Sequence, residues 1–250
     1  MKVELGKVAL VTGASAGIGR AIATRLAKAG YRVVITARRI HRLHALRDEL
    51  LADDISVDTY QADVRDDAQL QGLFTFIREH YGRLDVLVNN AGLGRNASLL
   101  DGESSAWREM FDVNVIALSI CTQHAVKLMR EMEDRGQIIH ISSMSGHRVP
   151  TGTGGMYSAT KHAVRALTEA LRRELRAQDS RIKVTAISPG FVETEFAEVM
   201  SGSRETAEAV YGRFPCLQPD DIASTVMHIL AQPEHAQIHD VLMRPTQQPS

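Results

Sequence analysis

Short apolar runs alternate along the chain with longer segments whose apolar residues recur at helical spacing. Apolar runs of about four to eight residues predict buried strands, and the longer periodic segments predict helices. Glycines such as Gly30 and Gly82 follow several of the helical segments and act as stop signals. The expected strands are Val8–Val11, Tyr31–Ala37, Ile55–Ala62, Leu84–Val88, Gln137–Ile141, Ile182–Ile187 and Val241–Met243. The expected helices are Ile18–Ala29, His41–Ala52, Asp66–Tyr81, Glu103–Arg135, Tyr157–Gln178 and Pro219–Ala231.

This alternation predicts the fold class. Strands that are apolar throughout and alternate with helices indicate a parallel sheet covered on both faces. We therefore predict an α/β fold in which residues 1–250 form a single doubly wound Rossmann domain with about seven strands. Two stretches, 142–156 and 191–217, interrupt the rhythm. Both follow a strand, so we expect them at the ligand-binding edge of the sheet, with 191–217 as a substrate lid.

Composition and charge exclude several classes of protein. The 250 residues carry 29 Lys+Arg and 30 Asp+Glu, a net charge of −1. Nucleic acids and anionic membranes both attract basic proteins, so we expect neither as a partner. No leader segment or apolar run of about 18 residues is present, which predicts a cytoplasmic protein. The two cysteines, Cys121 and Cys216, are far apart, so we expect no disulfide framework and no metal site.

The turn after the first strand is rich in small residues. Such a turn lets a pyrophosphate approach the backbone, and the N-terminus of the next helix favours its negative charge. Tight packing of a strand on a helix also requires glycine, so the turn alone does not decide between these interpretations. The residues of the turn are Gly13, Ser15, Ala16, Gly17, Ile18 and Gly19.

Two arginines follow the second strand where dinucleotide folds that prefer NAD carry an acid. An Asp or Glu about 20 residues after the glycine turn accepts from the ribose 2′-hydroxyl of NAD. Here the neighbourhood contains Arg38 and Arg39, and no acid occurs before Asp48. Guanidinium groups suit a 2′-phosphate, although either arginine could also be a solvated surface charge. We predict NADP(H) as the cofactor in preference to NAD(H).

Tyr157 and Lys161 are four residues apart in an expected helix and therefore lie on one face. An adjacent ammonium lowers the pKa of a phenol toward working pH, as a general acid–base requires. A chance pair of surface residues is the alternative. Hydroxyl residues at Ser142, Ser143 and Ser145 follow the strand that ends at Ile141, and they could also form turns or caps.

With these motifs in order, the chain resembles the short-chain dehydrogenase/reductase family from Val8 to about Pro245. The matching motifs are the glycine turn, Asp63-Val64, Asn89–Gly92, Asn114, Ile141–Gly146, Tyr157 with Lys161, and Pro189-Gly190 with Thr194. The resemblance implies an NADP(H)-dependent oxidoreductase that interconverts a ketone or aldehyde and its alcohol. It also implies a small-molecule substrate and a homotetramer, or a dimer, built on the two longest helices.

The resemblance also implies roles for individual residues. Tyr157 is the expected acid–base, Lys161 its partner and a ligand of the nicotinamide ribose, and Ser143 a hydrogen-bond partner of the carbonyl. Asn114 is expected to kink its helix and hold a water that links Lys161 to solvent. The other expected cofactor contacts are Asp63 and Val64 at adenine, Asn90, Ala91 and Gly92 along the cleft, and Pro189, Gly190, Val192 and Thr194 at the nicotinamide end.

Several alternatives remain open in the sequence. The spacing from Ser143 to Tyr157 is one residue longer than in the commonest family pattern, so Ser145 is the fallback for the serine role. A ketoacyl-carrier-protein reductase and an NADP-sensing regulator without turnover are the alternative functions. His140 and His147 are interpreted as incidental. The apolar side chains of the expected lid and neighbouring loops predict a largely apolar pocket, but they do not identify the substrate, the direction of reaction or its stereochemistry.

Overall fold

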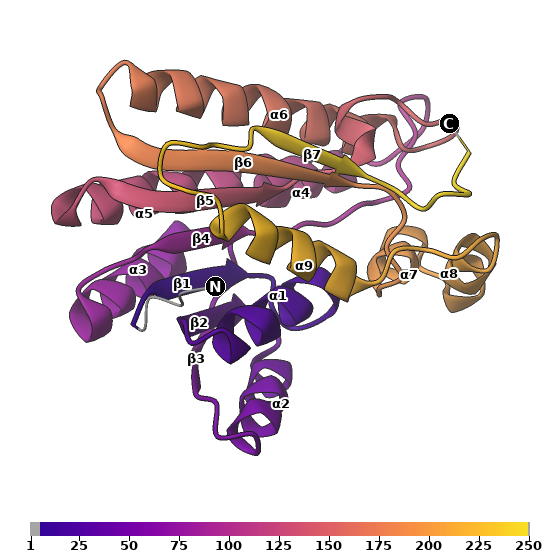
Figure 1. Ribbon diagram of the computed structural model, residues 1–250. Helices are drawn as coiled ribbons and strands as arrows, with labels where there is room; N and C mark the ends of the chain where they lie inside the picture. The colour runs from indigo at the N-terminus through magenta and orange to yellow at the C-terminus, as the bar shows by residue number, and fades with distance from the viewer. Residues whose placement is uncertain (1–5, 250) are drawn as a thin grey trace.

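The computed structural model describes residues 6–249, and these form a parallel sheet with helices on both faces (Figure 1). Residues 1–5 and 250, which the single-domain prediction includes, lie outside the described residues. Within 6–249 the sheet has seven strands in the order β3-β2-β1-β4-β5-β6-β7. The strands are β1 (Val8–Thr12), β2 (Arg32–Ala37), β3 (Val57–Gln61), β4 (Val86–Asn89), β5 (Arg135–Ile141), β6 (Arg181–Pro189) and β7 (Asp240–Met243). The predicted α/β fold class is confirmed.

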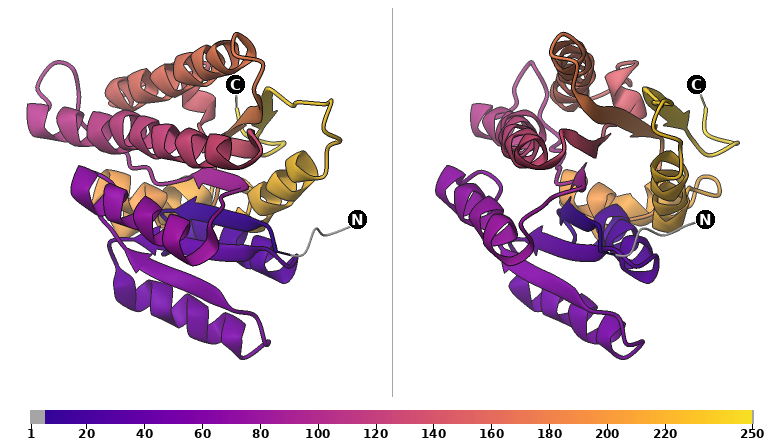
Figure 2. Two further views of the ribbon diagram at one scale, coloured as in Figure 1. Left: turned by 90° about the vertical axis from the view of Figure 1, so that its left-hand side faces the viewer. Right: turned by 60° about the vertical axis from the view of Figure 1, so that its left-hand side comes forward.

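Each face of the sheet is covered by its own set of helices, as the right-hand view of Figure 2 shows. Successive residues of a strand point to opposite faces. In β1, Leu10 therefore joins the core under α3, α5 and α6, whereas Val11 joins the core under α1, α2 and α9. The helices are α1 (Gly17–Lys28), α2 (Ile40–Leu51), α3 (Asp67–Tyr81), α4 (Ser104–Phe111), α5 (Leu118–Met132), α6 (Gly155–Arg176), α7 (Phe196–Ser201), α8 (Arg204–Tyr211) and α9 (Pro219–Leu230).

Local signals set several of these boundaries. The Asp66 side chain accepts hydrogen bonds from the backbone N–H groups of Ala68 and Gln69, at 2.9 and 3.1 Å, and so caps the start of α3. The same helix ends at Gly82, which has a φ of 65°. Left-handed backbone of this kind favours glycine, so the stop signal in the sequence has a direct structural cause.

The helical stretch predicted over Glu103–Arg135 is helical from Ser104 to Met132, but it is not a regular α-helix throughout. The segment consists of α4, a π-helical turn at Asp112–Ala117 and α5, and Arg135 already belongs to β5. Wider turns of this type are frequent at functional sites. Here the turn contains Asn114, whose side chain is hydrogen-bonded to a neighbouring loop as described below.

The segment 191–217 lies beyond the carboxyl ends of β6 and β7, where Figure 1 shows α7 and α8. A β-bridge between Val192 and Leu217 joins the two ends of this segment, which we call the base of the lid. The strand order reverses between β1 and β4, and ligands of open α/β sheets bind beside such a reversal. The fold therefore brings the glycine turn, the β5 end and the expected lid to one edge.

Candidate active site

Glycine is required in the β1–α1 turn because no side chain fits there. Gly13 has a φ of 67°, and a Cβ atom at this position would lie 2.8 Å from the Cα atom of Ala91. A Cβ atom at Gly19 would lie 2.6 Å from the carbonyl oxygen of Gly13. Helix α1 begins at Gly17 without a side-chain cap. The unobstructed backbone and the uncapped helix N-terminus form a cradle suited to a phosphate group.

Replacing Gly13 with alanine is expected to lower the free energy of unfolding by about 3 kcal/mol, because left-handed strain adds to the clash with Ala91. Gly82→Ala is the matched control: its φ is 65°, but a Cβ atom there meets nothing within 4 Å. The control should lose only about 1 kcal/mol. Urea denaturation measures both values, and equal losses would show that the close approach to Ala91 has no energetic effect.

The loop after β4 is tied to the same turn by Asn90. Its side-chain nitrogen donates to the carbonyl oxygens of Thr12 and Gly13, at 2.9 and 3.2 Å. The Thr12 hydroxyl accepts from the backbone N–H groups of Asn90 and Ala91, both at 3.0 Å. Asn90 thus positions the turn, whereas the buried Asn89 side chain donates to Thr122 on the other side of the strand.

The two arginines that follow β2, Arg38 and Arg39, have different neighbours. One guanidinium nitrogen of Arg39 donates to the Ser15 hydroxyl at 3.1 Å. The Asp63 carboxylate pairs with Arg65 at 2.6 Å, and the hydrogen bond from Arg65 is the largest cause of the lowered pKa of Asp63. The positive charge of Arg38 also lowers this pKa. Arg39 therefore borders the glycine turn, while Arg38 lies on the side of Asp63.

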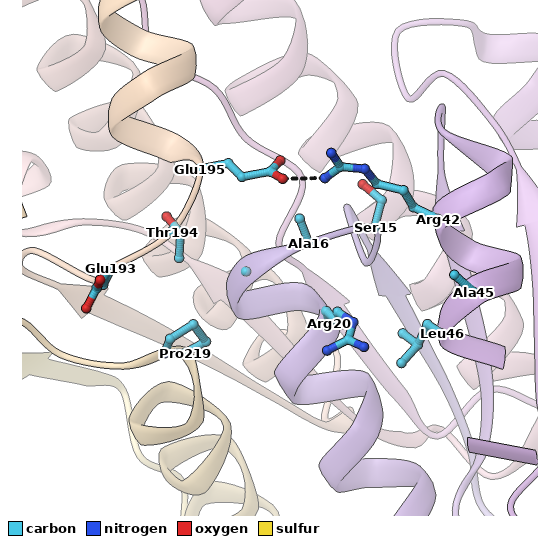
Figure 3. A pocket seen from close by; sticks show the side chains of 11 residues that line it. Ser15, Ala16, Arg20, Arg42, Ala45, Leu46, Glu193, Thr194, Glu195 and Pro219 are labelled. Atoms are coloured by element: carbon cyan, nitrogen blue, oxygen red, sulfur yellow. Dashed lines mark hydrogen bonds and ion pairs between the residues drawn. The ribbon is translucent and has the colours of Figure 1, made fainter. Parts of the chain in front are cut away.

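A cavity of about 430 Å³ opens beside the glycine turn (Figure 3). Its lining includes Arg42 and Glu195, which face each other across it and form an ion pair. The sequence reasoning missed both residues. A weak signal was available, because Arg42 follows Arg39 by three residues at the start of a helix and so lies on the same face.

Tyr157 and Lys161 meet at the same edge of the sheet, at the start of α6. Their exposed fractions are 9% and 5%. The Lys161 ammonium donates to the carbonyl oxygen of Ile141 at 3.0 Å and lies 5.7 Å from the centre of the Tyr157 ring. Residue spacing alone predicted this juxtaposition, and the burial excludes a pair of solvated surface residues.

Ser143 is the serine that reaches Tyr157. It follows β5 in extended conformation, and its hydroxyl hydrogen-bonds the tyrosine. It also accepts from the backbone N–H of Ser145 at 3.1 Å. In this structure the fallback residue Ser145 therefore supports Ser143 through its backbone.

Asn114 occupies the π-helical turn close to Lys161. Its side chain accepts from the backbone N–H of Leu93 at 2.8 Å and donates to the Leu93 carbonyl at 2.8 Å and to the Thr160 hydroxyl at 3.0 Å. A Cβ atom at Gly92 would lie 3.3 Å from the Asn114 oxygen and 3.7 Å from the Lys161 nitrogen, so both groups border one small space. The expected water relay through Asn114 stays a prediction.

Burial is the main influence on the pKa values of Tyr157 and Lys161. It raises the pKa of Tyr157 to about 12, and the hydrogen bond from Ser143 offsets only part of this rise. Burial also lowers the pKa of Lys161 to about 8. The expectation that the pKa of the phenol is lowered toward neutral pH is therefore wrong, because desolvation disfavours the phenolate. At pH 7 the tyrosine is protonated and can donate.

Replacing Ser143 with alanine is expected to lower kcat for carbonyl reduction by about 10²- to 10³-fold, as for loss of an oxyanion-type donor. Steady-state kinetics with a ketone measures this. Ser145→Ala is the matched control and should retain kcat within about threefold, because the contact it makes to Ser143 uses its backbone N–H. A larger loss in the control would transfer the role to Ser145.

The lid segment lies directly on the tyrosine. The rings of Phe196 and Tyr157 are 5.4 Å apart between centroids. Leu93 and Met156 belong to the same apolar cluster. Arg95, a neighbouring cation, is held by Glu109 at 2.9 Å and by the carbonyl oxygen of Val199 at 3.0 Å. The side of Tyr157 that faces the lid is therefore apolar, and Arg95 is already paired.

The remaining expected cofactor contacts lie around the lid base. Val192 is buried, and a Cβ atom at Gly17 would lie 3.0 Å from Thr194, so the lid segment touches the glycine turn. The N–H of Gly190 donates to the carbonyl of Met243 at 2.8 Å, which ties the end of β6, including Pro189, to β7. Val64, after β3, is also buried.

The histidines near β5 have structural partners. His140 is fully buried between the hydroxyls of Thr122 and Thr168, at 3.2 and 2.8 Å, and burial lowers its pKa to about 3. His147 contacts Ser188 and Asp240. Across residues 6–249 no group of three or more His, Cys, Asp or Glu side chains is arranged to hold a metal ion. The same residues include no helix long and apolar enough to cross a membrane.

The structure thus places a phosphate cradle of the dinucleotide-binding type at the same sheet edge as Ser143 and the buried Tyr157 and Lys161. A family model described as short chain dehydrogenase matches residues 7–204. The chain therefore belongs to the short-chain dehydrogenase/reductase family.

Relatives match over nearly the whole chain. Dehydrogenase/reductase SDR family member 11 of Bos taurus is 46% identical over 247 residues, which cover 97% of both proteins. Farnesol dehydrogenase of Aedes aegypti is 40% identical over 243 residues, 96% of both. The solved closed form of serine dehydrogenase complexed with NADP+ superposes with a TM-score of 0.90 at 34% identity, covering 97% of this chain and 96% of that one.

Proposed function

We propose that this chain is an NADP(H)-dependent oxidoreductase that interconverts a neutral, apolar ketone or aldehyde and the corresponding alcohol. The observation that carries the proposal is the contact of Ser143 with the buried Tyr157, with Lys161 beside the tyrosine ring. A protonated phenol next to a hydroxyl is an acid placed to serve a carbonyl oxygen.

The residues present fit a dinucleotide phosphate. The cradle at Gly13 and Gly19 is closed to any Cβ atom, and the first turn of α1 has no side-chain cap. Ser15, Arg38 and Arg39 would hold the 2′-phosphate. Asp63 and Val64 would border the adenine. Asn90, Ala91 and Gly92 would line the cleft with Ala16 to Ile18, and Pro189, Gly190, Val192 and Thr194 would hold the nicotinamide end. A neighbour at 34% identity was solved with NADP+, which supports this assignment.

The chain supplies the proton and the orientation. When bound, the cofactor provides a hydride for the carbonyl carbon or accepts one in the reverse direction. The Tyr157 hydroxyl donates its proton to the carbonyl oxygen as the alcohol forms. Ser143 donates a hydrogen bond that orients this oxygen, and the Lys161 ammonium favours the phenolate that remains. We propose that Asn114 holds the water through which a proton returns to Tyr157.

The apolar surroundings of the tyrosine favour an apolar substrate. Phe196 covers the Tyr157 ring, and Arg95 is held by Glu109. A carboxylate on the lid side of the tyrosine would therefore find Arg95 already paired, and burial of an unpaired charge would cost several kcal/mol. The name of the Aedes aegypti relative, farnesol dehydrogenase, agrees with an apolar alcohol.

Kinetics with paired cofactors and paired substrates test the proposal. We expect kcat/KM for NADPH to exceed that for NADH by about tenfold or more, and Arg38→Gln to reduce only the NADPH value. We expect kcat/KM for an apolar ketone to exceed kcat/KM for the keto acid of equal length by a similar factor. A preference for NADH, or for the keto acid, would contradict the corresponding part of the proposal.

We also propose that copies of the chain assemble in the cytoplasm as a homotetramer, or a dimer, through the helices from α4 to α6. Ile116 and Leu167 on these elements are 51% and 37% exposed, and a second copy of the chain on this face would cover them. Light scattering after gel filtration measures the mass, and a monomer would contradict the assembly.

A further inference from the structure

Glu195 connects the lid segment to the start of α2. Its carboxylate accepts from both terminal nitrogens of Arg39 at 3.1 Å and also pairs with Arg42. Glu195 is 156 positions from Arg39 in the sequence, so the contact joins two segments that lie far apart along the chain. We call the group of Arg39, Arg42 and Glu195 the strap.

Two residues of the strap, Arg42 and Glu195, line the cavity beside the phosphate cradle. Figure 3 shows Glu195 and Arg42 pointing toward each other, with Ala16 of the glycine turn between the two elements that carry them. The cavity of about 430 Å³ is bordered by the turn on one side and by Thr194 on the other. A cofactor phosphate held at the start of α1 would therefore have the strap on its outer side.

Neighbouring charges make other connections. Glu193 lines the same cavity, but its carboxylate accepts from Gln218 at 2.9 Å, at the base of the lid itself. Arg20 pairs with Glu49. The strap holds two positive charges and one negative charge, so it remains attractive to a phosphate while it holds the lid in place.

The strap is also next to the candidate acid. Phe196 follows Glu195 directly, and its ring lies 5.4 Å from the Tyr157 ring. A displacement of Glu195 would shift the backbone that carries this ring, and so would widen the cavity and uncover the tyrosine.

We propose that Glu195 is a positioning residue that retains the bound dinucleotide, by holding the lid against α2 through Arg39 and Arg42. The inference rests on the proposed NADP(H) site. In this account the strap opens for the cofactor to leave, and the carboxylate does not compete with the 2′-phosphate for the arginines.

The test is the dissociation rate constant of the reduced cofactor, followed by NADPH fluorescence after mixing the complex with excess NADP+. Glu195→Gln is expected to raise this rate constant about tenfold, for NADPH and NADH alike. The factor is modest because the three side chains are between 38% and 42% exposed, and exposed ion pairs are weak. Arg42→Gln should give a similar increase, and the double variant no more than the larger single effect.

Glu193→Gln is the matched control, since it removes a carboxylate from the same cavity without touching the strap, and its rate constant should equal that of the wild type. An unchanged rate constant in Glu195→Gln overturns the inference. A slower rate that is confined to NADPH would also overturn it, because it shows competition with the 2′-phosphate. If the wild-type protein fails to bind NADPH, the proposed function itself fails, which is a distinct result.

Discussion

Replacing Tyr157 with phenylalanine is expected to lower kcat for NADPH-dependent ketone reduction by about 10³-fold. General acid–base catalysis contributes about 10²- to 10⁴-fold, and the phenol is protonated at neutral pH because burial raises its pKa to about 12. The phenylalanine ring keeps the contact with Phe196, so the loss isolates the hydroxyl. Steady-state rates and the NADPH dissociation constant should be measured together, and the dissociation constant should stay within about threefold.

Tyr81→Phe is the matched control. Its hydroxyl hydrogen-bonds Asp58, and burial raises its pKa as at Tyr157, but it ends α3 away from the site. This variant should retain kcat. Full activity in the Tyr157→Phe protein would contradict the assignment of Tyr157 as the acid, whatever the control shows.

Replacing Lys161 with methionine is expected to lower kcat by about 10²- to 10³-fold. The substitution removes the charge that favours the phenolate and also the donor to the carbonyl of Ile141. Methionine retains a long apolar chain in a position that is only 5% exposed, so the volume of the side chain is largely kept. Thermal denaturation of the variant separates a catalytic loss from unfolding.

The pH profile gives Lys161 a second signature. Burial lowers its pKa to about 8, so the ammonium is present below this pH and lost above it. We expect kcat for reduction in the wild type to be level below pH about 8 and to fall above it. Tyr157, with a pKa of about 12, stays protonated through this range. The fall should be absent in Lys161→Met; a fall retained at the same pH would assign it to another group.

Much of the fold follows from the sequence because strand and helix patterns are local. The apolar run at Val8–Thr12 and the cap and stop signals of α3 specify their elements within a few residues. The π-helical turn at Asp112–Ala117 could not be predicted in this way. Its residues have an ordinary helical pattern, and the partners of Asn114 lie in a loop and in α6.

Part of the candidate site could likewise be predicted from the sequence, and part could not. Tyr157 and Lys161 were predictable because four residues on a helix bring two side chains together. The strap was not, because Glu195 meets Arg39 and Arg42 only through the fold. Burial is likewise a property of the folded chain, which is why the direction of the pKa shift at Tyr157 differed from the expectation.

The central claim is that the chain transfers hydride and does not only bind the dinucleotide. Reduction of an apolar ketone with NADPH that carries deuterium at both positions of nicotinamide C4 tests this most directly, with the alcohol analysed by mass spectrometry. The account predicts one deuterium on the carbinol carbon for each NADPH consumed, and little in the Tyr157→Phe protein. Tight binding of NADPH with no labelled alcohol from any ketone, aldehyde or keto ester in a broad set would contradict it and would favour a sensor of the cofactor.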